Sequence, residues 1–329
     1  MQTTTVPGQN LRRMPVVMRS KLMLEAASEL VGSPDWDDRQ VEINFRVQGA
    51  ESWKIRFFAS DAPNSIDAVA SGRADIAICN PGAVLSMALN GAAPFKEPIP
   101  VRAIFVLPQF DQFAFAVKAD TGITSLADIR DRKYPLRVSL RGQRDHSVHL
   151  VASQVLEAYG FSFDDIERWD GVVRLDDEFP NGPNRIGAVE RGEIEAIWDE
   201  ALPMFGQRAL ELGMRFLPVD EPELRQLEAK GLRRVAIPRS IYPALESDVW
   251  TVDFSGWPVF CLESTPDQIV TAFCAAVEAR KANVPWYGEG PMDLKLMVSD
   301  PPEAPLTIPL HPAARRFWQE KGYLPEGPL

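Results

Sequence analysis

The sequence predicts an α/β protein built from two lobes, and three observations support this prediction. The chain has 329 residues, and at roughly 150 residues per domain this length argues for about two domains. Segments with strand-like and helix-like patterns alternate, which favours parallel α/β units. A helix–glycine–strand pattern at residues 68–78 also recurs at residues 188–198.

Several segments carry clear local signals. Apolar and polar residues alternate over 41–47, which predicts a strand exposed on one face. The spacing from Ser125 to Asp128 fits a capping box and predicts a short helix. Residues 264–267 predict an N-cap with proline in the first turn, and apolar residues follow at helical spacing.

The C-terminal part contains a proline-rich stretch. Residues 284–312 hold seven prolines, a composition that predicts an ordered surface connection instead of a long helix. A final short helix is expected to begin near His311 and to end near Gly322.

The repeated pattern ends in polar residues in both copies. One predicted strand ends at Asn80, Pro81 and Gly82, and the other at Asp199 and Glu200. Ligands of open α/β sheets bind beyond the carboxyl ends of the strands, so we expect these two segments to face each other across one cleft. The alternative is that an α/β chain simply reuses one kind of unit. Trp198 is a candidate cleft residue, although such a residue more often packs in a core.

Composition excludes several classes of protein. The hydrophobic fraction of 45% and charged fraction of 25% are typical of a soluble globular protein. A formal net charge of -11 disfavours nucleic acid and anionic lipid as partners. The three cysteines form no close-spaced pair, so neither a disulfide framework nor a zinc cluster is indicated, and buried thiols are expected.

Targeting signals are weak in this sequence. No stretch approaches the roughly 18 apolar residues of a membrane span. Residues 1–15 contain Arg12 and Arg13 without an apolar run behind them, which does not fit a secretory signal. The chain as given is therefore expected to be cytoplasmic, or to have lost a signal and gained a start methionine.

A polar loop at 141–147 lies between a predicted strand and a predicted helix. Such a loop can bind an anion, because unpaired backbone N–H groups and the positive end of the helix dipole face outward there. Its candidate ligand-binding residues are Arg141, Gln143, Arg144, His146 and Ser147. We expect Arg141→Ala to weaken carboxylate binding about tenfold to a hundredfold, with little change in melting temperature.

Two other interpretations of this loop remain open. In one, Asp145 or Ser147 only caps the helix and the arginines lie in water. In the other, His146 and His149 serve an enzyme or a metal, but no further ligand has suitable spacing, so no metal site is predicted. No phosphate-binding loop, dinucleotide fingerprint or serine-hydrolase elbow occurs, so no cofactor is expected.

Motifs in a fixed order resemble the TAXI family of TRAP-transporter solute-binding proteins, which have the type 2 periplasmic binding-protein fold. The resemblance covers about 67–324 and is carried by residues 70–77, 117–128, 155–160 and 308–314. It implies two lobes with a ligand cleft between them. Residues 1–117 and 218–329 would form the first lobe, and residues 118–217 the inserted second lobe.

The resemblance also implies a function. Such a receptor closes on a small carboxylate and presents it to a membrane transporter, in the periplasm if a signal has been removed. The family's ligand loop falls on residues 145–148, and its turn after the first strand falls on residues 17–20, which adds Arg19 and Ser20 to the candidate ligand-binding residues.

Two further functions fit the same fold, because fold does not fix function. One is a cytoplasmic decarboxylase or dehydratase of a cyclic carboxylic acid, with Asp145, His146 or Glu200 as acid and base. The other is a ligand sensor that partners another protein.

Overall fold

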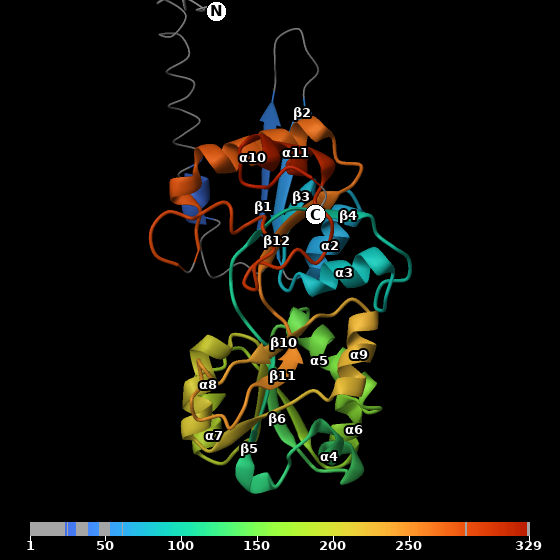
Figure 1. The fold of residues 1–329 in the computed structure, drawn as a ribbon. Helices are drawn as coiled ribbons and strands as arrows, with labels where there is room; N and C mark the ends of the chain where they lie inside the picture. Colours follow the sequence, from blue (N-terminus) through green and yellow to red (C-terminus); the bar gives the residue numbers. More distant parts are fainter. Residues whose placement is uncertain are drawn as a thin grey trace, which may run out of the picture.

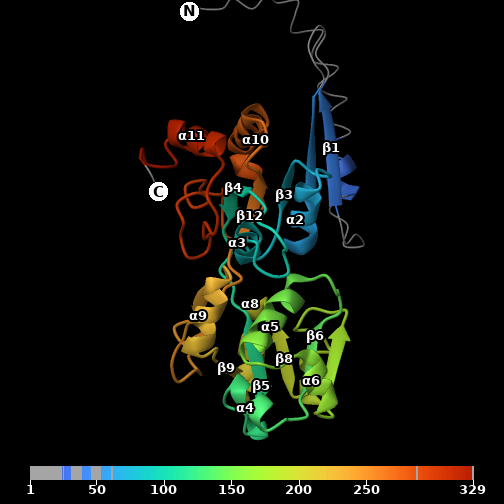
Figure 2. The same ribbon diagram turned by 90° about the vertical axis from the view of Figure 1, so that its right-hand side faces the viewer.

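The computed structural model describes Leu24 and residues 26–30, 39–45, 53–60, 62–286 and 288–327. Two five-stranded mixed sheets form the centres of two lobes, one above the other in Figure 1. The view in Figure 2, turned by 90°, shows the same separation, with helices packed around each sheet. The sequence-based prediction of a two-lobed α/β fold is therefore confirmed.

The first lobe contains the sheet with strand order β1-β2-β3-β12-β4. Strands β2 and β3 are parallel, whereas β1 and β12 run antiparallel to their neighbours. Its strands are β1 (Arg39–Phe45), β2 (Trp53–Ala59), β3 (Ile76–Ile78), β4 (Val101–Leu107) and β12 (Trp257–Leu262). Its helices are α2 (Ala62–Ala70), α3 (Ala83–Asn90), α10 (Asp267–Ala279) and α11 (Pro312–Glu320).

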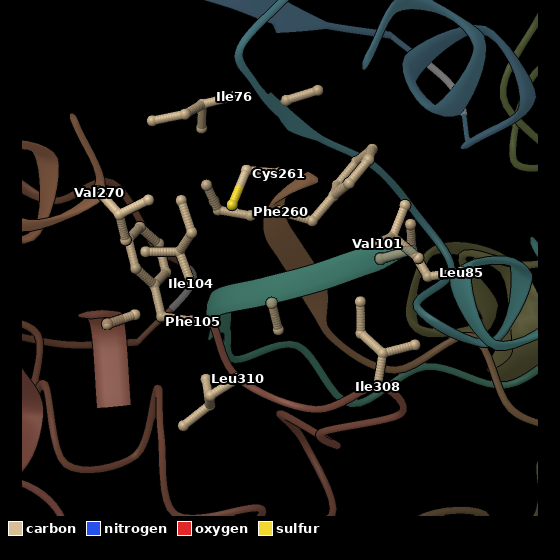
Figure 3. Packing of buried hydrophobic residues seen from close by; sticks show 14 of the residues in the cluster. Ile76, Leu85, Val101, Ile104, Phe105, Phe260, Cys261, Val270, Ile308 and Leu310 are labelled. Carbon is tan, nitrogen blue, oxygen red and sulfur yellow. The ribbon is translucent and has the colours of Figure 1, made fainter. Parts of the chain in front are cut away.

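The core of the first lobe joins segments that are distant in the sequence. Phe105 on β4, Phe260 on β12, Val270 on α10 and Leu310 near the C-terminus gather in one apolar cluster (Figure 3). The final segment is held there by backbone hydrogen bonds, since Ala103 N donates to Pro309 O at 2.9 Å. The described residues of the proline-rich stretch thus form an ordered connection, as the sequence predicts, but the connection is not confined to the surface, because Leu294, Val298 and Leu310 are buried in the core.

The second lobe contains the sheet with strand order β7-β6-β8-β5-β9 and a separate β10–β11 pair. Its strands are β5 (Ala114–Lys118), β6 (Arg137–Arg141), β7 (Val172–Asp176), β8 (Ala196–Asp199), β9 (Met214–Leu217), β10 (Arg234–Ile237) and β11 (Val249–Val252). Its helices are α4 (Leu126–Asp131), α5 (Ser147–Ala158), α6 (Phe163–Arg168), α7 (Ile186–Glu190), α8 (Leu202–Glu211) and α9 (Glu221–Ala229).

The repeated sequence pattern occupies equivalent places in the two sheets. Gly72 after α2 and Gly192 after α7 both have φ of +72°, a conformation that glycine adopts without strain. The strand that follows each glycine pairs with a parallel strand on one side and an antiparallel strand on the other. The repeat therefore reflects two lobes with similar central strands.

Most of the predicted helices and strands occur in the structure, but some helix N-termini are capped differently from the prediction. Ser125 forms the capping box with Asp128, and His311 caps α11. Helix α10 begins at Asp267 after Pro266, without a side-chain cap. The predicted strand at 41–47 is β1, which begins and ends two residues earlier.

The division of the chain between lobes differs from the predicted boundaries at 117 and 217. Strand β5 already belongs to the second sheet at Ala114. Beyond Leu217, Leu224 and Leu227 on α9 join the second-lobe cluster, as does Val252 on β11. The chain leaves the second lobe only after Val252, because burying the apolar face of α9 against α5 keeps residues 218–252 there.

The lobes are joined by two crossover segments, residues 108–113 and 253–256. Hydrogen bonds connect these two segments to each other. Ser255 Oγ accepts from Asp111 N and donates to Asp111 O, both at 3.0 Å. Gln112 and Asp253 form a β-bridge, and Gly256 N donates to Gln109 O at 2.8 Å. The connection between the lobes is therefore a paired two-stranded unit.

Candidate functional site

Three parallel strands of the second lobe end in charged residues at one edge of the sheet. Arg141 ends β6, Asp176 ends β7 and Asp199 ends β8. Because β6 pairs in parallel with both β7 and β8, these three side chains start from the same edge. This is the edge at which open α/β sheets bind ligands.

Arg141 is held by two carboxyl groups. Its Nε lies 3.1 Å from Asp199 Oδ2, and its Nη2 lies 2.7 Å from Glu200 Oε1. The guanidinium also stacks on the ring of Phe179, at 4.8 Å from the centroid. Arg141 therefore lies at the predicted site, with its charge balanced by protein carboxyl groups.

Arg185 is a site residue that sequence reasoning missed. It is completely buried before α7 and pairs with Asp199 through Nη1. Its Nε donates to Ser139 Oγ at 2.9 Å, and its Nη2 donates to Ser139 O at 3.3 Å. Asp199, which is also fully buried, thus lies between two guanidinium groups. No local sequence pattern marks Arg185, because its role depends on tertiary contacts.

Asp111 is a second residue that the sequence did not indicate. It lies on the first crossover, and its carboxyl accepts hydrogen bonds from the backbone N–H groups of Gln112, Ala201 and Leu202 at 2.8 to 3.2 Å. Ala201 has φ of +59°, a left-handed conformation that is unusual for alanine. The carboxyl group of Asp111 thus connects the first crossover to the N-terminus of α8 through hydrogen bonds.

Glu200 and Asp111 are both buried, and each carboxyl group affects the pKa of the other. Burial raises the pKa of Asp111 to about 6, although its hydrogen bonds with Glu200 and the three backbone N–H groups oppose the increase. Burial, and next the charges of Asp111 and Asp199, raises the pKa of Glu200 well above its usual value. The pair therefore retains a proton at a higher pH than isolated carboxyl groups would.

His146 caps α5, whereas the alternative interpretation of this loop named Asp145 or Ser147 as the cap. Its Nδ1 accepts from Val148 N at 3.2 Å. Burial, and next the charge of Arg141, lowers the pKa of His146 to about 3. The ring is therefore neutral at ordinary pH, and its 3.7 Å approach to Glu200 Oε1 is not an ion pair under those conditions.

Ser147 connects the two lobes. Its hydroxyl donates to Asn80 O at 2.6 Å and accepts from Ala62 N at 3.2 Å. Nearby, Asn64 Nδ2 donates to Asp145 Oδ2. The N-terminus of α5 therefore lies against the first lobe beside the end of β3.

The segment 80–82 lies at this contact between the lobes. Asn80 Oδ1 is buried without a hydrogen-bond partner among the described residues. Pro81 and Gly82 are buried, and Thr307 Oγ1 donates to Gly82 O at 2.7 Å. Ser147 contacts Asn80 here, and the expectation that this segment faces Asp199 and Glu200 across one cleft stays a prediction.

A polar cavity of about 450 Å³ borders Arg141. Its other lining residues are Gly142, Gln143 and residues 176–179. Arg144 follows on the same loop and is exposed. The structure thus brings Arg141 and Gln143 to one cavity, with Arg144 one residue beyond.

The remaining predicted site residues lie elsewhere. Trp198 is completely buried in the second-lobe core, where its ring lies 5.3 Å from Phe115 and 6.1 Å from Phe163, measured between centroids. The packing interpretation of Trp198 therefore fits its position, and the cleft interpretation does not. Arg19 and Ser20 lie outside the described residues.

The part of the chain that the structure describes lacks two kinds of feature. It contains no group of three or more His, Cys, Asp or Glu side chains arranged to hold a metal ion. It also contains no helix long and apolar enough to cross a membrane.

The sequence matches the NMT1-like family over residues 43–322. Among solved structures, a periplasmic transporter is similar at 16% identity, with 80% of this chain and 81% of that chain covered and a TM-score of 0.36. A TctC solute-binding protein from Polaromonas has 16% identity, coverages of 62% and 63%, and a TM-score of 0.34. A glycine betaine/L-proline-binding protein from Borrelia burgdorferi has 11% identity, coverages of 65% and 66%, and a TM-score of 0.38.

Proposed function

The chain belongs to the NMT1-like family, and on this premise we propose that it is a solute-binding receptor that closes on a small carboxylate-containing ligand. Two lobes joined by paired crossovers support a mechanism of hinge closure without a covalent step. The resemblance to the TAXI branch extends the proposal to a TRAP-type membrane transporter as the partner, and to a periplasmic location.

One observation carries the carboxylate assignment: the cluster of cationic and amide groups beside the cavity. Arg141 and Gln143 line it, and Arg144 follows on the same loop at the N-terminal end of α5. Three acidic residues, Asp176, Asp177 and Glu178, also line the cavity. Asp176 pairs with Arg174 at 2.9 Å and Glu178 accepts from Asn184, and these contacts reduce the repulsion of an anion by Asp176 and Glu178.

A screen followed by calorimetry tests this proposal. Thermal shift with mono- and dicarboxylates would identify a hit, and isothermal titration would then compare wild type with Arg144→Ala and Arg141→Ala. Loss of a charge-assisted hydrogen bond weakens binding by about 1.5 to 3 kcal/mol, so we expect affinity to fall about tenfold to a hundredfold in Arg141→Ala. A smaller decrease is expected for the exposed Arg144.

The structure changes one expectation about these variants. Arg141→Ala leaves Asp199 and Glu200 without one of their partners, so it lowers the melting temperature as well as the affinity. Arg144→Ala is the cleaner test, because the side chain is exposed. Arg168→Ala, an exposed arginine on α6, is the matched control and should bind like wild type.

Unchanged affinity in both loop variants would contradict the assignment of the anion site. Conversion of the hit to a product would instead favour the decarboxylase or dehydratase alternative.

A further inference from the structure

The first lobe contains an apolar cavity that the proposed ligand site does not use. Its volume is about 340 Å³, and its lining residues come from β1, β2, β3, β12 and α10. All of the described lining residues are apolar, so their side chains offer water no hydrogen-bond partners. The favourable occupant of this cavity is therefore a set of apolar side chains.

One face of the first sheet forms the floor of the cavity. Val41 on β1 is opposite Phe57 on β2, and Phe57 is opposite Ile76 on β3, so the three side chains form a row on one face. The ring of Phe273 on α10 lies 5.3 Å from the ring of Phe57, measured between centroids. Of the described lining residues, Phe273 is the only one on a helix, so α10 borders the cavity on one side.

The sequence at residues 21–31 has the pattern of an amphipathic helix. At about 100° per residue, every apolar residue of this segment lies on one side of a helix. The polar residues lie together on the other side: Lys21, Glu25, Ser28 and Glu29. The residues of this segment that the structure describes, Leu24 and residues 26–30, are helical. The segment therefore presents an apolar face that needs a partner.

The two large apolar side chains that the structure describes in this segment are exposed. The exposed fraction is 55% for Leu24 and 66% for Leu30. Figures 1 and 2 show this described part next to β1, at the edge of the first sheet. An exposed apolar helix face and an apolar cavity thus occur on the same lobe, and packing one against the other would remove both from water.

We propose that the apolar face of residues 21–31 packs into this cavity and completes the core of the first lobe. The chain from Leu30 to Arg39, where β1 begins, spans at most about 30 Å when extended. Because this connection is short, the effective concentration of the segment at the cavity is on the order of millimolar. The segment of the same chain is therefore favoured over that of a second copy in a dilute protein solution.

Replacing Leu30 with glutamate tests the contribution of the apolar face. Full burial of a leucine favours packing about tenfold to a hundredfold, so Leu30→Glu should lower the fraction of packed segment by that factor. A fluorescent dye that binds apolar surfaces should then bind Leu30→Glu more strongly than wild type. Ser28→Glu introduces the same charge at an exposed position on the polar side, so this matched control should bind the dye like wild type.

Methyl NMR of the wild-type protein tests the contact directly. With labelled isoleucine, leucine and valine methyl groups, nuclear Overhauser effects should connect Leu24 or Leu30 with the cavity residues Val41 and Ile78. Leu30→Glu should shift the methyl signals of Val41 and Ile78, whereas Ser28→Glu should leave them unchanged.

Three results would overturn the proposal. The first is the absence of these Overhauser effects in wild type, which does not depend on how any variant folds. The second is equal dye binding by Leu30→Glu and Ser28→Glu. The third is Overhauser effects that occur only between differently labelled copies in a mixed sample, because the occupant would then be a second copy of the chain.

Discussion

Replacing Arg185 with methionine tests the buried ion-pair cluster most severely. Methionine keeps much of the side-chain length but removes the charge, so Asp199 loses one of its two guanidinium partners while it remains fully buried. The change also removes the hydrogen bonds to Ser139 Oγ, Ser139 O and Glu178 O. Breaking a buried pair by removing one partner costs about 3 to 5 kcal/mol.

We expect a loss of about 3 kcal/mol in the free energy of unfolding, because Arg141 continues to pair with Asp199. Urea denaturation followed by tryptophan fluorescence measures this quantity, and urea leaves the ion pairs unscreened. Arg191→Met is the matched control: its partner Glu193 and Arg191 are about half exposed, so the loss should stay below about 1 kcal/mol.

A double variant sharpens the test. Arg185→Met combined with Asp199→Asn removes the unpaired charge, so the two losses should not add. A loss below about 1 kcal/mol for Arg185→Met alone, or strict additivity in the double variant, would refute the interpretation that Asp199 depends on Arg185.

The remaining predictions concern the contact between the lobes, one histidine and the thiols. Ser147→Ala leaves two backbone groups of the first lobe without their partner, so fluorescence energy transfer between labelled lobes should report a more open protein, whereas exposed Ser153→Ala on the same helix should not change the transfer. His146 has a folded-state pKa of about 3, below its unfolded value of about 6.5, so its contribution to stability is present above pH 6.5 and is lost as pH falls toward 3, by up to about 1.4 kcal/mol per pH unit. Unfolding free energies should therefore decrease less steeply with falling pH in His146→Asn than in wild type, and parallel curves would contradict this. Burial raises the pKa of Cys261 to about 12, so a thiol reagent at pH 8 should label none of the three buried cysteines in the native protein and all three in urea; labelling of the native protein would contradict their burial.

Elements with local chemical signals could be predicted from the sequence. The capping box at Ser125, the glycines at 72 and 192 and the charged ends of β6 and β8 are recognisable because each depends on neighbouring residues. These signals also led to Arg141 as a site residue and to the placement of Asp199 and Glu200 at a strand end.

Features that depend on tertiary contacts could not be predicted. Asp111 gains its role because the crossover passes the N-terminus of α8, and Arg185 because its side chain reaches the end of β8. The lobe boundary was misplaced at 217 because the apolar face of α9 does not indicate which sheet will cover it. His146 is an uncommon residue for an N-cap, so the preference for serine or aspartate pointed to its neighbours.

The central claim is that the protein binds a carboxylate reversibly between or beside its lobes and does not transform it. The most direct measurement is a titration of the wild-type protein with a carboxylate identified in the thermal-shift screen. A proton NMR time course on the same sample follows. The account predicts saturable binding that weakens in Arg144→Ala, with the ligand signals unchanged over time. The appearance of product signals, or binding that is the same in Arg144→Ala and Arg141→Ala as in wild type, would contradict it.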